Sequence, residues 1–471
     1  MSKILLLLVS IFIFSSCYEN NDNISSPNVI VIISDDQGYA DVGFHGSKEI
    51  FTPNIDRIAN NGVVFSEGYV SYAVCSPSRA GLITGRYQNR FGYTRNILLA
   101  PKDSLMGLPL TEQTLPDVLG KANYKTKAIG KWHLGAHESL VPERRGFDEF
   151  FGFIIGGHRY FPEDLTINDL TEARRQMDGY ITRIYDNGNR IDTKKYLTEE
   201  LSNNAVKFIE DNSDNPFFLY LSYNAPHTPL QATKKDLERN MHIEVEKRRT
   251  YAAMVSSMDD GIGLILDKLE EKKISDNTIV IFFSDNGGVE WYNFSDNGVL
   301  RGIKGDFFEG GIRVPFTMQW PKKIKPGITY DKPIIALDVF ATVASAASAE
   351  KYIKNDIDGV DLLPYLTGDK FGLPHEYLYW QNRDKDIDVV RDERYKYLRI
   401  KNDEYIFDLK NDISEETNII NSSKPIYNRL KSKFKEWEKD MIDPVFLDLG
   451  MGKEYNKLNP DRWFNDSNPK K

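Results

Sequence analysis

Cysteine is nearly absent from this sequence, with only Cys17 and Cys75 among 471 residues. We expect Cys17 to end an N-terminal leader, so no disulfide would form within the mature fold and Cys75 would stand alone. Basic residues are also fewer than acidic ones: the sequence has 60 Lys and Arg and 69 Asp and Glu, which gives a formal net charge of −9. No basic field exists to attract a polyanion, so no nucleic-acid partner is expected, and an anionic substrate would need cations placed locally.

Long apolar runs are absent except at the N-terminus, where one lysine precedes the run from Ile4 to Phe14. This run is too short to span a bilayer and is typical of a secretion signal. Ser15-Ser16-Cys17 resembles the lipoprotein box of bacteria, in which the cysteine is lipidated and becomes the first mature residue. We therefore predict a lipoprotein signal peptide over residues 1–17 and a polar tether over residues 18–27.

The leader also predicts where the protein resides. We expect an exported protein that meets the membrane only through the lipid on Cys17, at the outer membrane, facing the periplasm or the cell surface. The alternatives are an ordinary cleaved signal or a short membrane anchor.

The remaining chain shows no internal repeat, and its length favours one large domain plus a smaller one. Over the first three-quarters, short apolar runs rich in β-branched and aromatic residues alternate with helix-like stretches, which is typical of an α/β fold. Uninterrupted apolar runs indicate strands that are buried on both faces. We therefore predict a large, mostly parallel sheet sandwiched by helices over residues 28–365.

Polar residues follow four of these apolar runs, at the point where each predicted strand ends. The strands and their polar ends are Asn28 to Ile33 with Asp35 and Asp36, Thr278 to Phe283 with Asp285 and Asn286, Thr126 to Ile129 with Lys131 and His133, and Phe217 to Tyr223 with His227. Ligands bind at the carboxyl ends of parallel strands, so these side chains predict one shared polar site. A single such Asp or His is more often a turn, cap or structural residue, and we assign Asp41 and His45 to that class.

The pattern changes after about Pro364, where we predict a smaller α+β domain over residues 366–471. Glu376 to Trp380, Tyr395 to Ile400 and Glu404 to Phe407 are typical of short antiparallel strands. Apolar residues at helical spacing predict an amphipathic helix from Lys424 to Met441. We interpret the aromatic residues of this domain as core.

The stretch around the lone cysteine, AVCSPSRAGLITG, predicts a helix that begins immediately after Cys75. A helix N-terminus presents free N–H groups and positive potential, and Arg79 adds a forked cation one turn later. The side chain at position 75 should therefore face an anionic group. The alternative is an inert, buried structural cysteine.

Cys75-Ser76-Pro77-Ser78-Arg79 followed by Leu82-Ile83-Thr84-Gly85 resembles the signature of type I sulfatases, members of the alkaline-phosphatase-like superfamily. Two further blocks reinforce the likeness, Ile129 to Gly135 and Arg301 to Pro315, although Asn123 stands where the former block usually has glycine. In this family a formylglycine-generating or anaerobic sulfatase-maturating enzyme oxidises the cysteine to formylglycine. The resemblance implies that Cys75 is the precursor of this group.

The implied chemistry is consistent with first principles. The aldehyde hydrates to a geminal diol, one hydroxyl attacks the sulfur of a sulfate ester, and a covalent sulfo-enzyme forms as the alcohol leaves. The second hydroxyl then loses its proton, and collapse to the aldehyde releases sulfate. A plain serine would form an ester with no such exit.

The resemblance also implies a metal and a set of roles. Asp35, Asp36, Asp285 and Asn286 offer only oxygen ligands, which favours calcium, or magnesium, over zinc, and the formylglycine at position 75 would be a further ligand. Arg79 would orient the formylglycine, Lys131 and Lys304 would grip sulfate oxygens, and His133 would deprotonate the second hydroxyl. The acid that protonates the leaving oxygen is assigned to His227, possibly shared with Lys304.

The segment from Gly152 to Asp192 lacks the surrounding strand and helix pattern, and we expect it to lie beside the site. Arg95, His158 and Arg159 are candidates for binding the sugar or a carboxylate on it, and a structural role is the alternative for each.

A lipoprotein sulfatase of this kind is similar to the polysaccharide sulfatases of Bacteroidetes-type bacteria. We therefore expect a marine algal polysaccharide of the ulvan or carrageenan type, or its oligosaccharides, as substrate, with a glycosaminoglycan as the alternative. Two other classes stay open: a phosphoester or phosphonate hydrolase of the same superfamily, and a non-catalytic glycan-binding lipoprotein. A pure binder would not need all the polar residues named above.

Overall fold

The computed structural model describes residues 26–173 and 175–459. The predicted signal peptide, Cys17 and residues 18–25 of the predicted tether lie outside the described residues. None of the described helices has the length and apolar character needed to cross a membrane.

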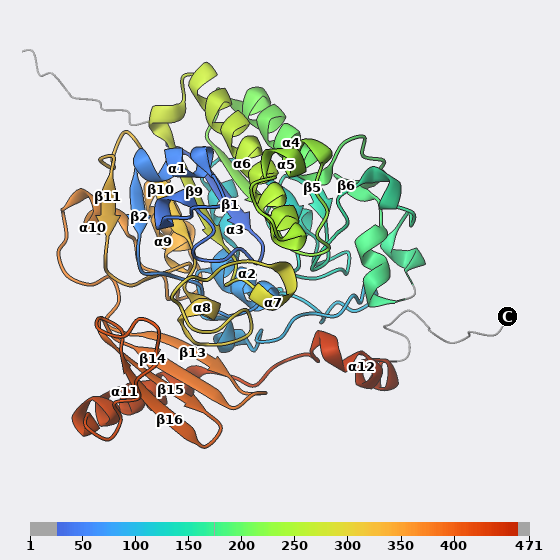
Figure 1. Ribbon diagram of the computed structural model, residues 1–471. Coiled ribbons are helices and arrows are strands. Elements are labelled where there is room, and N and C mark those ends of the chain that lie inside the picture. Colours follow the sequence, from blue (N-terminus) through green and yellow to red (C-terminus); the bar gives the residue numbers. More distant parts are fainter. Residues whose placement is uncertain (1–25, 174, 460–471) are drawn as a thin grey trace, which may run out of the picture.

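A ten-stranded sheet forms the centre of the larger part of the molecule (Figure 1). Its strands follow one another across the sheet in the order β11 (Ile328–Tyr330), β2 (Val63–Phe65), β10 (Phe316–Gln319), β9 (Thr278–Ser284), β1 (Asn28–Ser34), β8 (Phe217–Ser222), β4 (Lys125–Lys131), β5 (Glu149–Phe153), β6 (Ile184–Asp186) and β7 (Asn189–Ile191). The five strands from β9 to β5 run parallel to one another, whereas β10, β6 and β7 pair antiparallel with their neighbours. The prediction of a large, mostly parallel sheet is confirmed.

The apolar sequences of the central strands explain why these strands lie in the middle of the sheet. Every residue of β1, β8 and β9 is buried, as expected for continuous apolar runs covered on both faces. All four predicted strands are present and extend by at most two residues beyond the predicted ends, except that β8 ends at Ser222, one residue early.

Helices pack against this sheet in two groups. One group gathers around the long helix α6 (Glu246–Glu271) and consists of α1 (Pro53–Asn60), α4 (Leu197–Asn212) and α5 (Lys234–Arg239). The other gathers around α9 (Asp338–Ala346) and consists of α2 (Cys75–Thr84) and α3 (Leu115–Lys121). Shorter helices are α7 (Glu290–Asn293), α8 (Glu309–Ile312), α10 (Leu363–Thr367) and α12 (Gly452–Leu458).

A second, smaller sheet lies beside the larger part and is built from the C-terminal sequence (Figure 1). Its strands are antiparallel throughout, in the order β13 (Leu378–Asn382), β14 (Ile387–Arg391), β15 (Tyr395–Ile400) and β16 (Asp403–Asp408). Three of these strands match the predicted ones, and β14 was missed. The amphipathic helix α11 (Lys424–Trp437) packs on β14 and β15 and continues as a 3-10 turn, Glu438–Asp440, short of the predicted end.

A short pair of strands completes the larger part, in which β12 (Ile334–Ile335) pairs with β3 (Gly68–Tyr69). Close by, a buried ionic cluster joins the four-stranded sheet to α8 and to the segment after β16. The ammonium of Lys396 on β15 lies 2.9 Å from Glu309 Oε1 on α8 and 2.8 Å from Glu415 Oε1. Glu415 in turn accepts a hydrogen bond of 2.6 Å from the backbone N–H of Glu309. All three side chains are fully buried, so the pairing fixes the small sheet against the segment that follows Lys304.

Candidate active site

The polar ends of the central strands meet at one edge of the large sheet, as predicted. Ser34 at the end of β1 is in register with Ser284 at the end of β9, so Asp35 and Asp36 lie beside Asp285 and Asn286. On the other side of β1, strand β8 leads into the loop that carries His227, and β4 ends at Lys131. The sheet therefore brings together side chains that are far apart in the sequence.

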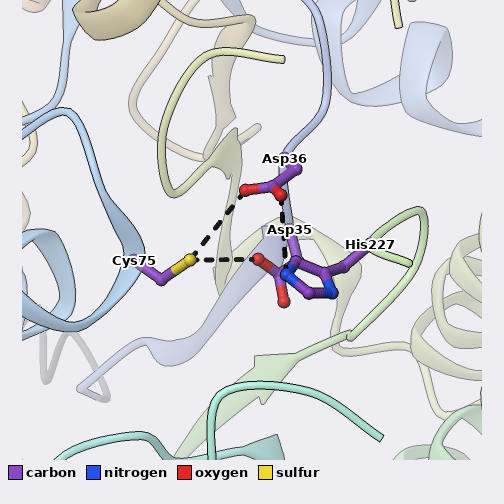
Figure 2. Close-up of side chains that lie close together, drawn as sticks. All are labelled: Asp35, Asp36, Cys75 and His227. Atoms are coloured by element: carbon purple, nitrogen blue, oxygen red, sulfur yellow. Dashed lines mark hydrogen bonds and ion pairs between the residues drawn. The ribbon is translucent and has the colours of Figure 1, made fainter. Parts of the chain in front are cut away.

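Cys75 is the first residue of α2, and the helix begins where the sequence predicts. Its sulfur lies 3.6 Å from Asp35 Oδ1, 3.9 Å from Asp36 Oδ1 and 3.0 Å from the ammonium of Lys304. Figure 2 shows the sulfur facing both aspartates, with His227 next to them. The ligand atoms of these three residues and Cys75 all lie within 4.8 Å of one another, so the group could hold a metal ion.

Each buried acid of the site has its own cation. Lys131 lies 2.6 Å from Asp35 Oδ2, and Lys304 lies 2.6 Å from Asp36 Oδ1. The third pair joins Arg79 and Asp285, at 2.9 Å from Nε and 2.8 Å from Nη2.

Charge in the site is balanced by this pairing. Burial opposes ionisation of Asp35, but Lys131 and the other cations outweigh it and hold the pKa of this carboxyl well below its usual range. Burial and the negative charge of Asp35 raise the pKa of Asp285, so these two neighbouring carboxylates shift in opposite directions.

Arg79 is held inside the protein by its side chain. It is fully buried, and besides Asp285 it donates to the backbone carbonyl of Lys131 at 3.2 Å and to the hydroxyl of Ser222. Sequence reasoning missed Ser222, although its place as the last residue of β8 could have identified it. Arg79 therefore braces the ends of β4, β8 and β9 together.

The unmodified Cys75 thiol is a poor nucleophile because it stays protonated. Burial raises the pKa of this thiol to about 12, because the neighbouring lysines only partly offset the loss of water. The surrounding cations and the helix N-terminus do not stabilise a neutral thiol, whereas they would stabilise an anionic ligand bound at this position.

His133 follows β4 in a left-handed backbone conformation, with a φ of 58°. Burial, and then the nearby Lys131 and Arg79, hold the pKa of its imidazole well below 6.5. Its Nδ1 is buried and has no hydrogen-bond partner among the described residues. The ring packs so closely on Gly156 that a Cβ there would lie 2.7 Å from Nε2. His133 is thus a neutral base fixed in position.

His227 approaches the same site from the loop after β8. Its Nδ1 lies 2.6 Å from the carbonyl oxygen of Thr228, and its Nε2 lies 3.6 Å from Asp36 Oδ2. The backbone contact holds the proton on Nδ1 and directs Nε2 towards the aspartates. The side chain is partly open to solvent, as a group that exchanges protons requires.

A cavity of about 160 Å³ opens beside Cys75 and is lined by His133, His227 and Lys304. Its other walls are mostly apolar and come from residues 97–99 and from Ile154, Ile155, Met177 and Tyr180. The expectation that the segment from Gly152 to Asp192 lies beside the site is confirmed. This segment contains the end of β5 and the strands β6 and β7, which the sequence pattern did not indicate.

The three predicted sugar-binding residues have different outcomes. His158 is fully buried, and its two ring nitrogens contact the carbonyl oxygens of Arg159 and Thr182, so the prediction that it binds substrate is wrong. Arg159 is 45% exposed and lies 3.8 Å from Asp164, outside the cavity beside Cys75. Arg95 forms a bidentate pair with Asp384 and lines a neighbouring cavity.

Other local expectations agree with the structure. Asn123 has a φ of 64°, the left-handed conformation that glycine and asparagine tolerate, so asparagine can occupy this turn before β4, where the family block usually has glycine. Asp41 is buried and paired with Arg248 at 2.7 Å, and His45 Nδ1 contacts the carbonyl oxygen of Tyr39, as structural residues do.

The fold and the site define a hydrolase of anionic esters in which Cys75 is surrounded by cations and oxygen ligands. The chain belongs to the sulfatase family, whose model matches residues 27–349, and it is a sulfatase, an enzyme that hydrolyses sulfate esters. A second model, described as N-sulphoglucosamine sulphohydrolase, C-terminal, matches residues 304–440.

Relatives are spread over bacteria and animals. The chain is 32% identical to the uncharacterized sulfatase YdeN of Escherichia coli, over 80% of this chain and 74% of that protein. It is 34% identical to human N-acetylgalactosamine-6-sulfatase over 72% of this chain, and spans 66% of the length of that relative.

Among solved structures, Ps i-CgsB in complex with k-i-k-neocarrahexaose is 35% identical, with a TM-score of 0.84 over 94% of this chain and 99% of that chain. The phosphonate monoester hydrolase of Agrobacterium radiobacter is 20% identical, with a TM-score of 0.62, over 88% of this chain and 95% of that chain, and shares the fold alone.

Proposed function

We propose that this sulfatase removes sulfate from a sulfated galactan of the carrageenan type, using a formylglycine made from Cys75 and a bound calcium ion. The carrying observation is the convergence of Asp35, Asp36, Cys75 and His227 within 4.8 Å, ringed by the cations of Arg79, Lys131 and Lys304. This arrangement matches the residues that the family signature implies for its chemistry.

The choice of sugar rests on the solved relative bound to a neocarrahexaose, which is 35% identical over nearly all of this chain. A glycosaminoglycan is the second candidate, favoured by the N-acetylgalactosamine-6-sulfatases and by the sulphohydrolase model that matches the C-terminal part. Desulfation of defined carrageenan and chondroitin oligosaccharides, followed by mass spectrometry, distinguishes them. Release of sulfate from the chondroitin series alone would overturn the galactan assignment.

The residues present fit a hard divalent cation. Asp35, Asp36, Asp285 and Asn286 supply only oxygen donors, and Oδ1 of Asn286 is buried with no hydrogen-bond partner among the described residues. Three carboxylates already balance the three cations, so a divalent ion would leave the site positively charged and complementary to a sulfate ester. When bound, the ion supplies charge stabilisation at the sulfate oxygens. Calcium is the expected ion and magnesium the alternative.

The residues of the chain divide the remaining work. Lys131 and Lys304 neutralise sulfate oxygens, and Arg79 fixes the helix that carries position 75. His133, neutral and without a partner at Nδ1, accepts the proton whose loss regenerates the aldehyde. The Nδ1 proton of His227 is held by the carbonyl oxygen of Thr228, so His227 acts as the acid in its doubly protonated form. The proton on Nε2 then passes to the leaving oxygen as the alcohol departs.

Conversion of Cys75 is the first test. Expression with a formylglycine-generating or anaerobic sulfatase-maturating enzyme should give a Cys75 peptide with the mass of the aldehyde, and activity should track the converted fraction. Sulfatase activity that survives in Cys75→Ala, or with the thiol unconverted, would refute the mechanism.

The alternative phosphoester or phosphonate hydrolase is tested separately, by rates on an aryl sulfate and on the matching aryl phosphate. We expect the sulfate to be the better substrate by a wide margin, because a single divalent ion beside Lys131 and Lys304 would suit a monoanionic sulfate ester better than a dianionic phosphate ester. A faster rate on the phosphate would reject the assignment.

We propose, finally, that the enzyme is exported and anchored at the outer membrane by lipid on Cys17. This rests on the sequence of residues 1–17 alone. Labelling with a palmitate analogue should mark the protein, and Cys17→Ser should release it into the soluble fraction. An unlabelled membrane-bound protein would favour a plain membrane anchor instead.

A further inference from the structure

Two more cavities flank the one beside Cys75, and one stretch of chain lines all three in order. Residues 94–96 line a cavity of about 300 Å³, residues 96–99 line the central cavity, and residues 101–102 line a cavity of about 940 Å³. Asn96 is shared by the first two cavities and Ala136 by the last two, while the outer cavities share no lining residue. The cavities therefore form a row with the catalytic residues in the middle, here named the 94–102 groove.

The stretch itself is irregular but firmly held. Oδ1 of Asn96 accepts a hydrogen bond from the backbone N–H of Ser76, next to Cys75, and its carbonyl accepts one from Leu449. Farther along, the N–H of Leu99 donates to the side chain of Gln176. The groove wall is thus tied both to the catalytic helix α2 and to the C-terminal segment.

The cavity at one end contains an unused hydrogen-bonding group. Tyr72 is 1% exposed, lines this cavity, and its hydroxyl has no partner among the described residues. An unpaired buried hydroxyl is costly unless a ligand or water satisfies it. Arg95 and Asp384, held together by a bidentate pair, form the adjacent wall. This combination of an aromatic hydroxyl, an acid and a guanidinium suits the hydroxyls of a sugar ring.

The cavity at the other end is the largest of the three and is more polar at its rim. Lys102 and Arg144 are exposed there, and Oε2 of Glu143 is buried and accepts no hydrogen bond from another residue described in the structure. This wall therefore contains both cations and acids, which suits a polymer that carries both sulfate groups and free hydroxyls.

We propose that the 94–102 groove binds an internal stretch of the polysaccharide, with sugar residues on both sides of the one that carries the scissile sulfate. The enzyme then acts along the chain and does not require a chain end. This proposal rests on the proposed carbohydrate sulfatase function and adds the length and placement of its substrate.

An end-blocked oligosaccharide tests the proposal. A carrageenan hexasaccharide that carries sulfate only on a central residue, with its non-reducing end chemically capped, should lose that sulfate at a rate close to that of the uncapped hexasaccharide. Removal of sulfate only from terminal residues would overturn the proposal while leaving the sulfatase function intact. Failure of every carbohydrate sulfate, with an aryl sulfate still cleaved, would overturn the proposed substrate class and this proposal with it.

Point variants test each end of the groove. Tyr72→Phe and Glu143→Gln should each lower the ratio of hexasaccharide to aryl sulfate kcat/KM by about fivefold, the effect of losing one hydrogen bond of about 1 kcal/mol. Tyr365→Phe, on α10 and outside all three cavities, is the matched control and should leave the ratio unchanged. An unchanged ratio in both groove variants would overturn the proposal. Retained thermal unfolding midpoints separate these outcomes from misfolding.

Discussion

The ammonium of Lys304 lies 3.0 Å from the sulfur of Cys75 and 2.6 Å from Oδ1 of Asp36. Burial opposes the charge of this lysine, but Asp36 and its acidic neighbours outweigh burial and hold the pKa of Lys304 well above its usual value. A proton held so tightly is a poor one to donate. We therefore propose that Lys304 acts as a fixed cation and that His227 transfers the proton to the leaving alcohol.

This division of roles predicts how substrate structure affects two variants. His227→Gln should lower kcat on a sugar sulfate by about 10²- to 10⁴-fold and much less on 4-nitrophenyl sulfate, whose alcohol leaves without protonation. Lys304→Met should lower both rates alike, by about 10²- to 10³-fold, because it removes charge stabilisation. The measurement is kcat for both substrates, with His242→Gln, an exposed histidine, as control. Equal losses for His227→Gln on both substrates would contradict the acid role.

Arg79→Lys should impair both folding and activity. Lysine cannot keep both contacts to Oδ2 of Asp285 together with the bonds to Lys131 and Ser222, so a buried carboxylate loses much of its pairing. We expect the free energy of unfolding to fall by about 3–5 kcal/mol, as measured by denaturant titration. The surface substitution Arg57→Lys, paired to Asp267 and Glu270, should cost less than about 1 kcal/mol. Equal costs would show that the buried network contributes little.

Metal binding should be measurable without any assay of activity. Calcium added to the chelator-treated protein should raise the free energy of unfolding by about 2.7 kcal/mol when the free ion is at about 100 times its Kd. Asp285→Asn should weaken this effect, because it removes one of the three carboxylates. Asp267→Asn, an exposed substitution on α6, should preserve it. An unchanged calcium response in Asp285→Asn would exclude Asp285 from the ligand set.

The sequence predicted those site residues that directly follow continuous apolar runs, and it failed where burial or contacts depend on the tertiary fold. The acids, Lys131 and the histidines at the strand ends were predictable because each follows an apolar run typical of a buried strand, whereas Lys304 was found only through the resemblance to a family block. Strand β14 was missed because its sequence, IDVVR, begins within a charged stretch. It also contains Asp388, which looks like a solvent-exposed residue in the sequence but is paired with Arg399 in the fold. His158 was wrongly assigned to substrate binding because its polar neighbours in the sequence suggest an exposed loop, and only the fold shows that its ring is buried. Ser222 could have been identified as the polar last residue of β8. Its contact with Arg79, like the place of Tyr72 beside Arg95 and Asp384, joins segments that no local pattern relates.

Gly156→Ala should slow catalysis while leaving the fold intact. A Cβ at this position would lie 2.7 Å from Cε1 and Nε2 of His133, so the imidazole must move away from its catalytic position. Because a shift of about 1 Å in a reacting group can cost about 10²-fold in rate, we expect a loss of that order in kcat. Gly120→Ala on α3, where a Cβ would meet nothing within 4 Å, is the matched control. An unchanged kcat in Gly156→Ala would mean that His133 has room to move or does not limit turnover.

The buried cluster of Lys396, Glu309 and Glu415 predicts a pH dependence of the free energy of unfolding. Burial, only partly offset by Lys396, raises the pKa of Glu415 from 4.5 to about 7 in the folded protein. A raised pKa means that the folded state binds this proton more tightly than the unfolded state does. The stabilisation is therefore complete below pH 4.5 and is lost as the pH rises through 7, for a total of up to about 3 kcal/mol.

Glu415→Gln removes this titration while keeping an oxygen for the backbone N–H of Glu309. The variant should therefore lose less unfolding free energy between pH 5 and pH 8 than the wild type, as followed by denaturant titration at each pH. Glu416→Gln, an exposed neighbour, should keep the wild-type slope. Parallel curves for Glu415→Gln and the wild type would mean that the carboxyl titrates alike in the folded and unfolded chains, and that Lys396 and the other cations compensate its burial in full.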